Sequence, residues 1–139
     1  MTKVADHSDL DFMVKCAKFF HEKSPLSGFK FSPQGSRSYL MSIMKNPDSI
    51  IFVNDSGAIA GIKQHLPFCD AYVSKELFWY SNDGRDGIKL LGAYLKWVDD
   101  CDIDLFTTLV GDNMADEKVV AYLARKGFSV IEKTMVRGL

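Results

Sequence analysis

The sequence predicts an α/β fold in which helices cover both faces of a mixed β-sheet. Segments with an apolar side chain every three to four residues alternate with short runs rich in Ile, Val and aromatic residues. Two of these runs flank the turn residues Asn54-Asp55-Ser56-Gly57, which is typical of an antiparallel hairpin. A third run, at residues 75–80, leads through a glycine-rich turn into an amphipathic helix. Strands flanked by helices in this order indicate one sheet covered on both sides.

The first 45 residues are expected to form a short strand at residues 3–5 and two helices. A capping box of Ser8 and Asp11 starts the first helix, which ends near residue 22, before Ser24-Pro25. The second helix spans residues 36–45 and stops at Asn46-Pro47. The spacing places one set of apolar side chains on the inward faces of the two helices: Leu10, Met13, Val14, Ala17, Phe20, Tyr39, Leu40, Ile43 and Met44.

The middle of the chain is expected to contain three strands and a helix. Residues 49–53 and 59–66 form the hairpin, and residues 75–80 form the next strand. The helix at residues 87–98 carries one apolar stripe, formed by Ile88, Leu91, Leu95 and Val98.

The rest of the chain is expected to alternate strand and helix. It gives a strand at residues 104–109, a loop at 110–113, a helix at 117–126 capped by Gly127, and a closing strand at 128–137. The complete order of elements is β-α-α-β-β-β-α-β-α-β.

Length and composition point to one domain over residues 1–139, because 47% of the side chains are apolar and allow a real core. The 17 basic and 18 acidic residues balance, so no nucleic-acid surface is expected. The residues printed predict neither a membrane span nor the apolar core of a signal peptide. Cys16, Cys69 and Cys101 lack metal-ligand spacing and indicate reduced thiols in the cytoplasm. His7 and His21 are expected to be exposed.

The turn before the third helix has the chemistry of a pyrophosphate site. Gly84 and Gly87 allow the backbone to approach a phosphate closely, and a helix that starts here aims its N–H groups and positive dipole end at one point. Arg85 and Lys89 add positive charge, whereas a carboxylate at Asp86 is unfavourable there unless it points away. An ordinary strand-to-helix turn uses the same residue types, so that alternative stays open.

This strand, turn and helix resemble the acyl-CoA motif of GNAT superfamily acetyltransferases. In that motif a loop of pattern Gln/Arg-x-x-Gly-x-Gly/Ala precedes a helix that opens with an aliphatic pair. Leu90-Leu91 matches the pair, Gly87 the last small residue and Asn82 the first loop position, while the middle glycine position falls on Arg85. The helix that ends in Gly127-Phe128 is similar to the last helix of the family. The motifs cover residues 50–139, and element order alone covers the first 45.

The resemblance is strongest to small single-domain GNAT-like proteins encoded by tailed bacteriophages and their hosts. It implies acetyl-CoA as the cosubstrate and no metal. The cofactor-binding residues that it implies are Trp79, Tyr80, Ser81, Asn82, Gly84, Arg85, Asp86, Gly87, Ile88, Lys89 and Asn113.

Two residues are candidates for acid–base catalysis. Glu76 begins the strand at residues 75–80 and would act as general base, sharing a strand face with Phe78 and Tyr80. Tyr122 lies one position before Leu123, where the family often has a tyrosine that acts as general acid. A solvated glutamate at a strand end and a tyrosine packed on its helix are the alternatives. The aromatic residues of the strand line a substrate pocket or belong to the core.

Two functions follow from the resemblance. The first is an N-acetyltransferase that moves an acetyl group from acetyl-CoA to a primary amine of a small molecule or a protein by direct attack. The alternative is a degenerate, non-catalytic GNAT-like protein that binds partners or is associated with a phage virion. The expected partner is the amine acceptor, without nucleic acid or membrane, and a homodimer would be usual for the family. The expected location is the cytoplasm, or the host cytoplasm if a phage encodes the protein.

Overall fold

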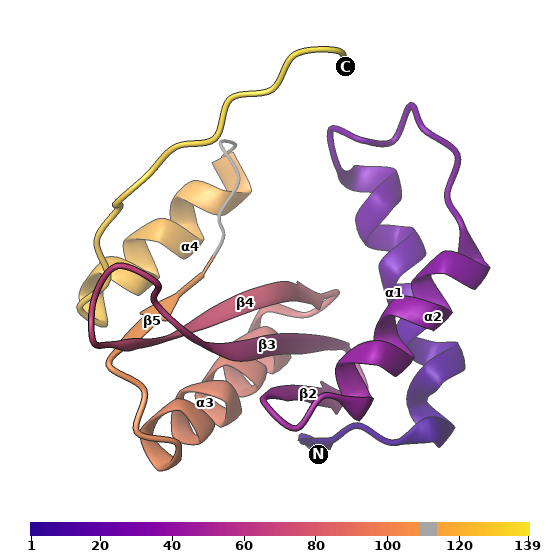
Figure 1. The fold of residues 1–139 in the computed structure, drawn as a ribbon. Coiled ribbons are helices and arrows are strands. Elements are labelled where there is room, and N and C mark those ends of the chain that lie inside the picture. The colour runs from indigo at the N-terminus through magenta and orange to yellow at the C-terminus, as the bar shows by residue number, and fades with distance from the viewer. Residues whose placement is uncertain (109–113) are drawn as a thin grey trace. The chain divides into compact units, whose positions relative to one another are not determined.

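The computed structural model describes residues 1–108 and 114–139, which divide into two compact units, Met1–Thr107 and Thr108–Leu139. The first unit holds a sheet of strand order β1-β2-β3-β4-β5 (Figure 1). Strands β1 to β4 are antiparallel to their neighbours and β5 is parallel to β4, so the predicted mixed sheet is confirmed. The strands are β1 (Lys3–Val4), β2 (Ser49–Asn54), β3 (Gly57–His65), β4 (Tyr72–Ser81) and β5 (Leu105–Thr107).

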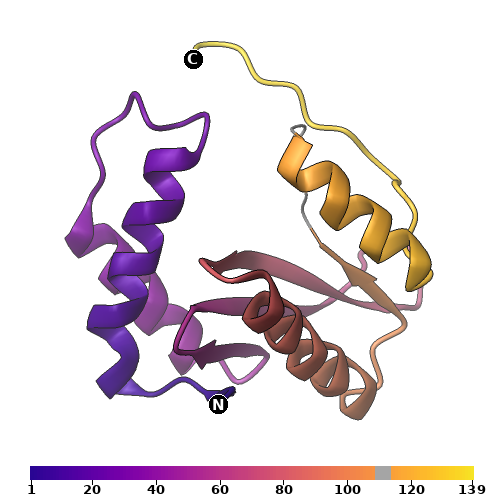
Figure 2. The same ribbon diagram turned by 180° about the vertical axis from the view of Figure 1, so that it is seen from behind.

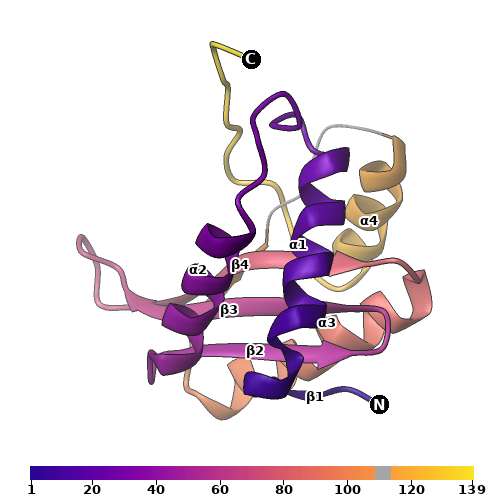
Figure 3. The same cartoon turned by 90° about the vertical axis from the view of Figure 1, so that its right-hand side faces the viewer.

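Helices cover both faces of this sheet. Helices α1 (Leu10–Lys23) and α2 (Pro33–Lys45) lie on one face, and α3 (Gly84–Asp100) lies on the other (Figures 2 and 3). The core beneath α1 and α2 consists of side chains from both helices and from β2 and β3. Its buried members are Leu10, Met13, Leu40, Ile43, Ile51, Val53, Ala58 and Ala60.

A short helix, η1 (His7–Asp9), precedes α1 and carries the cap. The carboxylate of Asp6 accepts the N–H of Ser8, and the carboxylate of Asp9 accepts the N–H of Asp6, at 2.8 and 2.9 Å. The predicted capping box of Ser8 and Asp11 is therefore wrong by two residues. The two residues of the box are three positions apart, as predicted, but the box lies nearer the N-terminus because η1 precedes α1.

Helix α2 begins three residues earlier than predicted, because Ser32 caps it and Pro33 occupies its first turn. The hydroxyl of Ser32 accepts the N–H of Gly35 at 3.0 Å. Two side chains predicted to face inward, Phe20 and Tyr39, are each 49% exposed. Periodicity assigns a helix face correctly, but the end of an inward stripe extends past the edge of the core.

The β2–β3 hairpin is confirmed, with Asn54 paired to Gly57 across a two-residue turn. The side-chain carbonyl of Asn54 accepts the N–H of Ser56 at 3.0 Å, which is the local bond that makes Asn a turn residue. A Cβ on Gly57 would lie 1.9 Å from the backbone oxygen of Tyr80. Only glycine therefore lets β4 approach the start of β3 this closely.

Helix α3 starts at Gly84 rather than at Gly87, since Asp83 is its cap. The predicted stripe is correct at Leu91 and Val98, while Ile88 is 44% exposed. The buried face is centred on Leu90, Leu91 and Tyr94. The earlier start does not change the spacing, but packing against the sheet selects a face of α3 that is rotated by about one residue from the predicted one.

The second unit contains α4 (Met114–Arg125), and the predicted cap at Gly127 is confirmed. Gly127 has a φ of +91°, its N–H donates to Ala124, and the N–H of Phe128 donates to Leu123. These two bonds form a Schellman motif. The closing strand predicted at residues 128–137 is wrong, because these residues form no strand. A strand needs a partner edge as well as β-branched residues, and propensity reports only the second.

Among the described residues, no helix is both long enough and apolar enough to cross a bilayer. Within the same residues, no group of three or more His, Cys, Asp or Glu side chains is placed to hold a metal ion. The predicted strand end at residue 109 and the loop at 110–113 lie outside the described residues.

Candidate functional site

Strand β4 contains a β-bulge beside the candidate base. Gly61 of β3 pairs with Glu76, whereas the preceding residue Ala60 pairs with Phe78. Leu77 is therefore the extra residue of β4. Because strand side chains alternate between faces, one extra residue reverses the faces of every residue that follows it.

The bulge places Glu76 on the α3 side of the sheet. A Cβ on its partner Gly61 would lie 1.7 Å from the hydroxyl oxygen of Tyr94, so this face of β3 meets α3. Glu76 is 7% exposed and is close enough to Tyr94 to raise the pKa of that phenol, together with the larger effect of burial. Burial brings the pKa of Tyr94 to about 12.

The neighbouring aromatic residues face the other way. Ala60 and Ala58 belong to the core beneath α1 and α2, and their partners Phe78 and Tyr80 share that face. The predicted common face of Glu76, Phe78 and Tyr80 is therefore wrong, because the bulge separates Glu76 from the other two. Its role as general base stays a prediction.

One edge of β4 is open over its second half. The parallel ladder with β5 joins only Val73–Lys75 to Leu105–Thr107. Among the described residues, no strand pairs with this edge of β4 from Leu77 to Ser81. Backbone N–H and C=O groups are therefore presented along an extended stretch that ends at the turn into α3.

The N-terminus of α3 is capped by the protein itself. The carboxylate of Asp83 accepts the N–H of Asp86 at 3.0 Å, and the backbone oxygen of Asp83 accepts the N–H of Gly87 at 2.9 Å. The hydroxyl of Ser81 donates to the same backbone oxygen at 2.6 Å. The N–H groups of Gly84 and Arg85 are the other donors of the first turn.

The second acidic residue of the turn points toward the β2–β3 hairpin. The carboxylate of Asp86 accepts hydrogen bonds from the hydroxyl of Ser56 and the ammonium group of Lys89. These two bonds lower the pKa of Asp86. The charge of Lys89 is thus paired within the protein, whereas Arg85 is exposed on the same turn.

Gly87 has a packing role that needs no ligand. A Cβ at this position would lie 3.2 Å from the Cβ of Ser81, and the indole N–H of Trp79 donates to the Gly87 carbonyl at 3.2 Å. Trp79 therefore holds α3 against β4. Gly84 differs, because a Cβ there would meet nothing within 4 Å.

Asn82, Tyr122 and Asn113 are the other predicted site residues. Asn82 is exposed, and its N–H donates to the backbone oxygen of Ser56 at 2.9 Å. Tyr122 is half-buried on α4, with Arg125 and Lys126 over its ring at 5.8 and 5.7 Å. Asn113 lies outside the described residues. The roles of Tyr122 and Asn113 stay predictions.

No protein-family model matches the chain, and no curated protein matches it either. Solved structures do match it along its whole length. A Bacillus halodurans protein has a TM-score of 0.78 at 14% identity, covering 100% of this chain and 99% of that one. A GNAT family acetyltransferase from Staphylococcus aureus has a TM-score of 0.68 at 13% identity, covering 100% and 98%. The chain has the GNAT fold. A transcriptional regulator from Bacillus halodurans shares it too, with a TM-score of 0.73, 12% identity and coverage of 100% and 99%.

On the α1 and α2 side of β4, this GNAT fold contains an aromatic cavity of about 260 Å³ that the sequence did not reveal. His21, predicted to be exposed, is half-buried in its wall. Its Nε2 atom lies 2.6 Å from the backbone oxygen of Phe29. The lining residues are Met13, Cys16, Ala17, Phe20, His21, Phe31, Ser36, Tyr39, Leu40, Leu77, Phe78 and Tyr80. Phe20 and Tyr39, assigned to the core by periodicity, are part of this wall.

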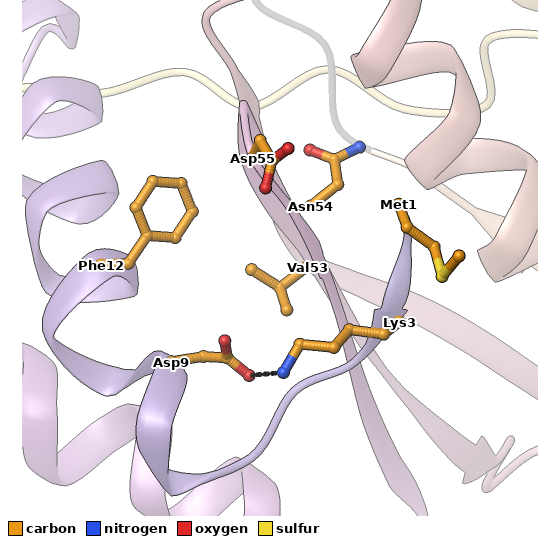
Figure 4. A pocket seen from close by; sticks show the side chains of 7 residues that line it. All are labelled: Met1, Lys3, Asp9, Phe12, Val53, Asn54 and Asp55. Carbon is orange, nitrogen blue, oxygen red and sulfur yellow. Dashed lines mark ion pairs between the residues drawn. The ribbon is translucent and has the colours of Figure 1, made fainter.

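A second hollow lies beside β1 and β2 (Figure 4). It is bounded by the ion pair between Lys3 and Asp9, whose atoms are 2.9 Å apart, and by Met1, Phe12 and Asn54. Asp9 also belongs to the cap of η1, so the charged wall of this hollow has a structural role. None of the residues predicted to bind acetyl-CoA or to act in catalysis lines it.

Proposed function

We propose that the chain is an acyltransferase that moves an acetyl group from acetyl-CoA to a primary amine. The observation that carries the proposal is the open edge of β4, which runs from Leu77 to the N-terminus of α3. An extended chain with amide groups can add to such an edge as a strand does. A helix N-terminus attracts phosphate. CoA carries both features in this order, since its pantetheine arm contains amide groups and leads to its pyrophosphate. A GNAT family acetyltransferase also shares the fold.

In this proposal the turn at α3 supplies the phosphate contacts. The N–H groups of Gly84 and Arg85 and the side chain of Arg85 are the donors, with Asn82, Ile88 and Lys89 around them. The amine nitrogen attacks the thioester carbonyl carbon, a C–N bond forms and the C–S bond breaks. The nitrogen loses one proton and the leaving thiolate gains one, so the products are an amide and CoA thiol. Glu76 and Tyr122 are the proposed carriers of these protons.

The acceptor is a primary amine of a small molecule or a protein in this proposal. The proposed place of action is the cytoplasm, where acetyl-CoA is available and the three free cysteines would remain reduced.

A second candidate function is a GNAT-shaped protein without catalysis, including one associated with a virion. The acidic cap favours it, because the carboxylate of Asp83 occupies the place where the helix dipole would attract a phosphate. Asp86 adds a second carboxylate and pairs with Lys89, which reduces the positive charge of the turn. Binding of CoA decides between the two functions.

The test is calorimetric titration with acetyl-CoA and with CoA, using Gly84→Glu as the disruptive variant. A side chain at residue 84 meets nothing within 4 Å, so the fold should tolerate this change while a negative charge is added at the site. Gly92→Glu is the matched control, since residue 92 is also on α3 and equally open. We expect Gly84→Glu to weaken binding and Gly92→Glu to leave it unchanged. Absence of binding to the wild-type protein would reject the acyltransferase and leave the second function.

A further inference from the structure

The aromatic cavity between α1, α2 and β4 shares three residues with the open edge of β4. Leu77, Phe78 and Tyr80 line the cavity, and their backbones belong to the stretch of β4 that lies beyond the ladder with β5 and pairs with no other strand on that side among the described residues. A molecule in the cavity therefore contacts the strand on which the proposed thioester would lie. The second hollow, beside β1 and β2, has no residue of β4 in its wall.

The size of the cavity limits its occupant. About 260 Å³ exceeds the roughly 150 Å³ of an apolar cavity that accepts benzene, and falls below the range of about 300–1,000 Å³ typical of drug-sized ligands. One ring with a short side arm fits between these limits. Five of the lining side chains are Phe or Tyr, so ring-to-ring contacts are available on several sides.

The absence of Asp, Glu, Lys and Arg from the cavity wall excludes anionic ligands. None of its lining residues is Asp, Glu, Lys or Arg. Burial raises the pKa of the Cys16 thiol to about 11, so this group is neutral at physiological pH. A carboxylate or phosphate would find no Lys or Arg here and would lose its hydration, which is costly. Because no Asp or Glu lines the cavity either, an amine enters it as the neutral free base, which is also the form that attacks a thioester.

His21 supplies a directional polar group to the cavity. The backbone oxygen of Phe29 can only accept a hydrogen bond, so the Nε2 atom that lies 2.6 Å from it is the donor. In the neutral ring the other nitrogen, Nδ1, then holds the lone pair. That nitrogen is a hydrogen-bond acceptor that suits the N–H of an amine.

We propose that this cavity binds the acceptor, and that the acceptor is a primary amine carried by a short arm on a single aromatic ring. The proposal rests on the proposed acyltransferase function and names its substrate class. The ring fills the aromatic end of the cavity, and the amine lies toward His21 and the open edge of β4. Because Glu76 is on the α3 side of this strand, transfer of the amine proton to Glu76 passes around the open edge through water.

The experiment measures binding of 2-phenylethylamine by calorimetry, with phenylacetate and a straight-chain alkylamine as comparison ligands. Ser36→Leu fills part of the cavity, because Ser36 lines it, whereas Ser38→Leu places the same side chain on the exposed surface of α2. We expect binding of the aromatic amine alone, at least about tenfold weaker in Ser36→Leu and unchanged in Ser38→Leu. If Ser36→Leu does not fold, Ala17→Leu with Lys18→Leu as control repeats the comparison on α1.

The outcomes separate this inference from the proposed function, because CoA binding is measured on its own. Binding of CoA without binding of the aromatic amine would overturn the inference and retain the acyltransferase. Binding of the aromatic amine without CoA would retain the cavity as a ligand site and reject the acyltransferase. Equal binding of phenylacetate, or a folded Ser36→Leu variant with unchanged affinity, would overturn the inference.

Discussion

The charge of Asp83 should oppose CoA binding, and its removal tests the location of the pyrophosphate directly. Asp83→Ser keeps an N-cap side chain, since Ser and Asp cap helices almost equally well. The hydrogen bond to the N–H of Asp86, now 3.0 Å long, can therefore re-form. The change should leave the free energy of unfolding within about 0.5 kcal/mol of the wild-type value. It removes one negative charge at the first turn of α3.

The expected gain in affinity follows from Coulomb's law. A pyrophosphate with two negative charges about 7 Å from the carboxylate, in water, is repelled by roughly 1.2 kcal/mol. Screening at about 0.1 M salt roughly halves this repulsion. CoA should therefore bind to Asp83→Ser about threefold more tightly at about 0.1 M salt, and up to about eightfold more tightly at low salt. The gain should shrink as salt concentration rises.

Calorimetric titration with CoA at low and high salt measures this gain. Asp99→Ser is the control, because it removes the same charge at the exposed C-terminal end of α3. Unchanged or weaker binding of CoA to a folded Asp83→Ser protein would refute the placement of the pyrophosphate at this turn.

Three further predictions concern stability and reactivity. Gly61→Ala should lower the free energy of unfolding by about 2 kcal/mol or more in denaturant titrations, because its Cβ would lie 1.7 Å from the Tyr94 hydroxyl oxygen. Gly84→Ala is the control, and it should leave the free energy of unfolding unchanged because residue 84 is at an open position. Burial raises the pKa of Tyr94 from 10.0 to about 12, so between these values the folded state retains a proton that the unfolded state loses. The resulting stabilisation is complete below pH 10 and disappears as pH rises toward 12. Tyr94→Phe should therefore flatten this part of a plot of unfolding free energy against pH. In the native protein at about pH 8, iodoacetamide should modify exposed Cys69 and spare buried Cys16, whose pKa is about 11; equal rates, read by mass spectrometry, would contradict the buried placement of α1.

Local chemistry in the sequence was enough to predict the hairpin and the strand–turn–helix unit. The turn of the hairpin depends on Asn54 and Gly57, whose preferences act over a few residues. The Gly127 cap was predictable for the same reason. In each case the determining contacts lie within about five residues along the chain, so the sequence contains them directly.

Features that depend on distant contacts could not be predicted in this way. The bulge at Leu77 arises where β4 meets β3, and no local pattern distinguishes Leu77 from its neighbours. Periodicity identified the helix faces of Phe20 and Tyr39 but could not distinguish a residue in the core from one that lines a cavity. The apolar residues after Phe128 have strand propensity, and the absence of a partner edge is a property of the fold.

The turn before α3 shows the same limit at the level of function. The sequence pattern marks Gly87 as a position where the backbone must come close to another group, and the structure shows that this neighbour is Ser81. The same pattern does not distinguish Asp83, although Asp is a common helix cap. A glycine-rich turn therefore predicts that another group packs closely there, but it does not predict whether that group is a ligand or a residue of the protein.

The bulge has a consequence for how such a chain can vary over evolutionary time. Because Leu77 is the extra residue of β4, its loss would leave Glu76 paired with Gly61 and Phe78 paired with Ala60. The strand would then alternate strictly, and Trp79 and Tyr80 would keep their present faces. A one-residue insertion between Phe78 and Ser81 without a second bulge would instead move the residues after it to the opposite layer of helices. Descendants of this chain should therefore tolerate loss of Leu77 far better than an insertion in the second half of β4.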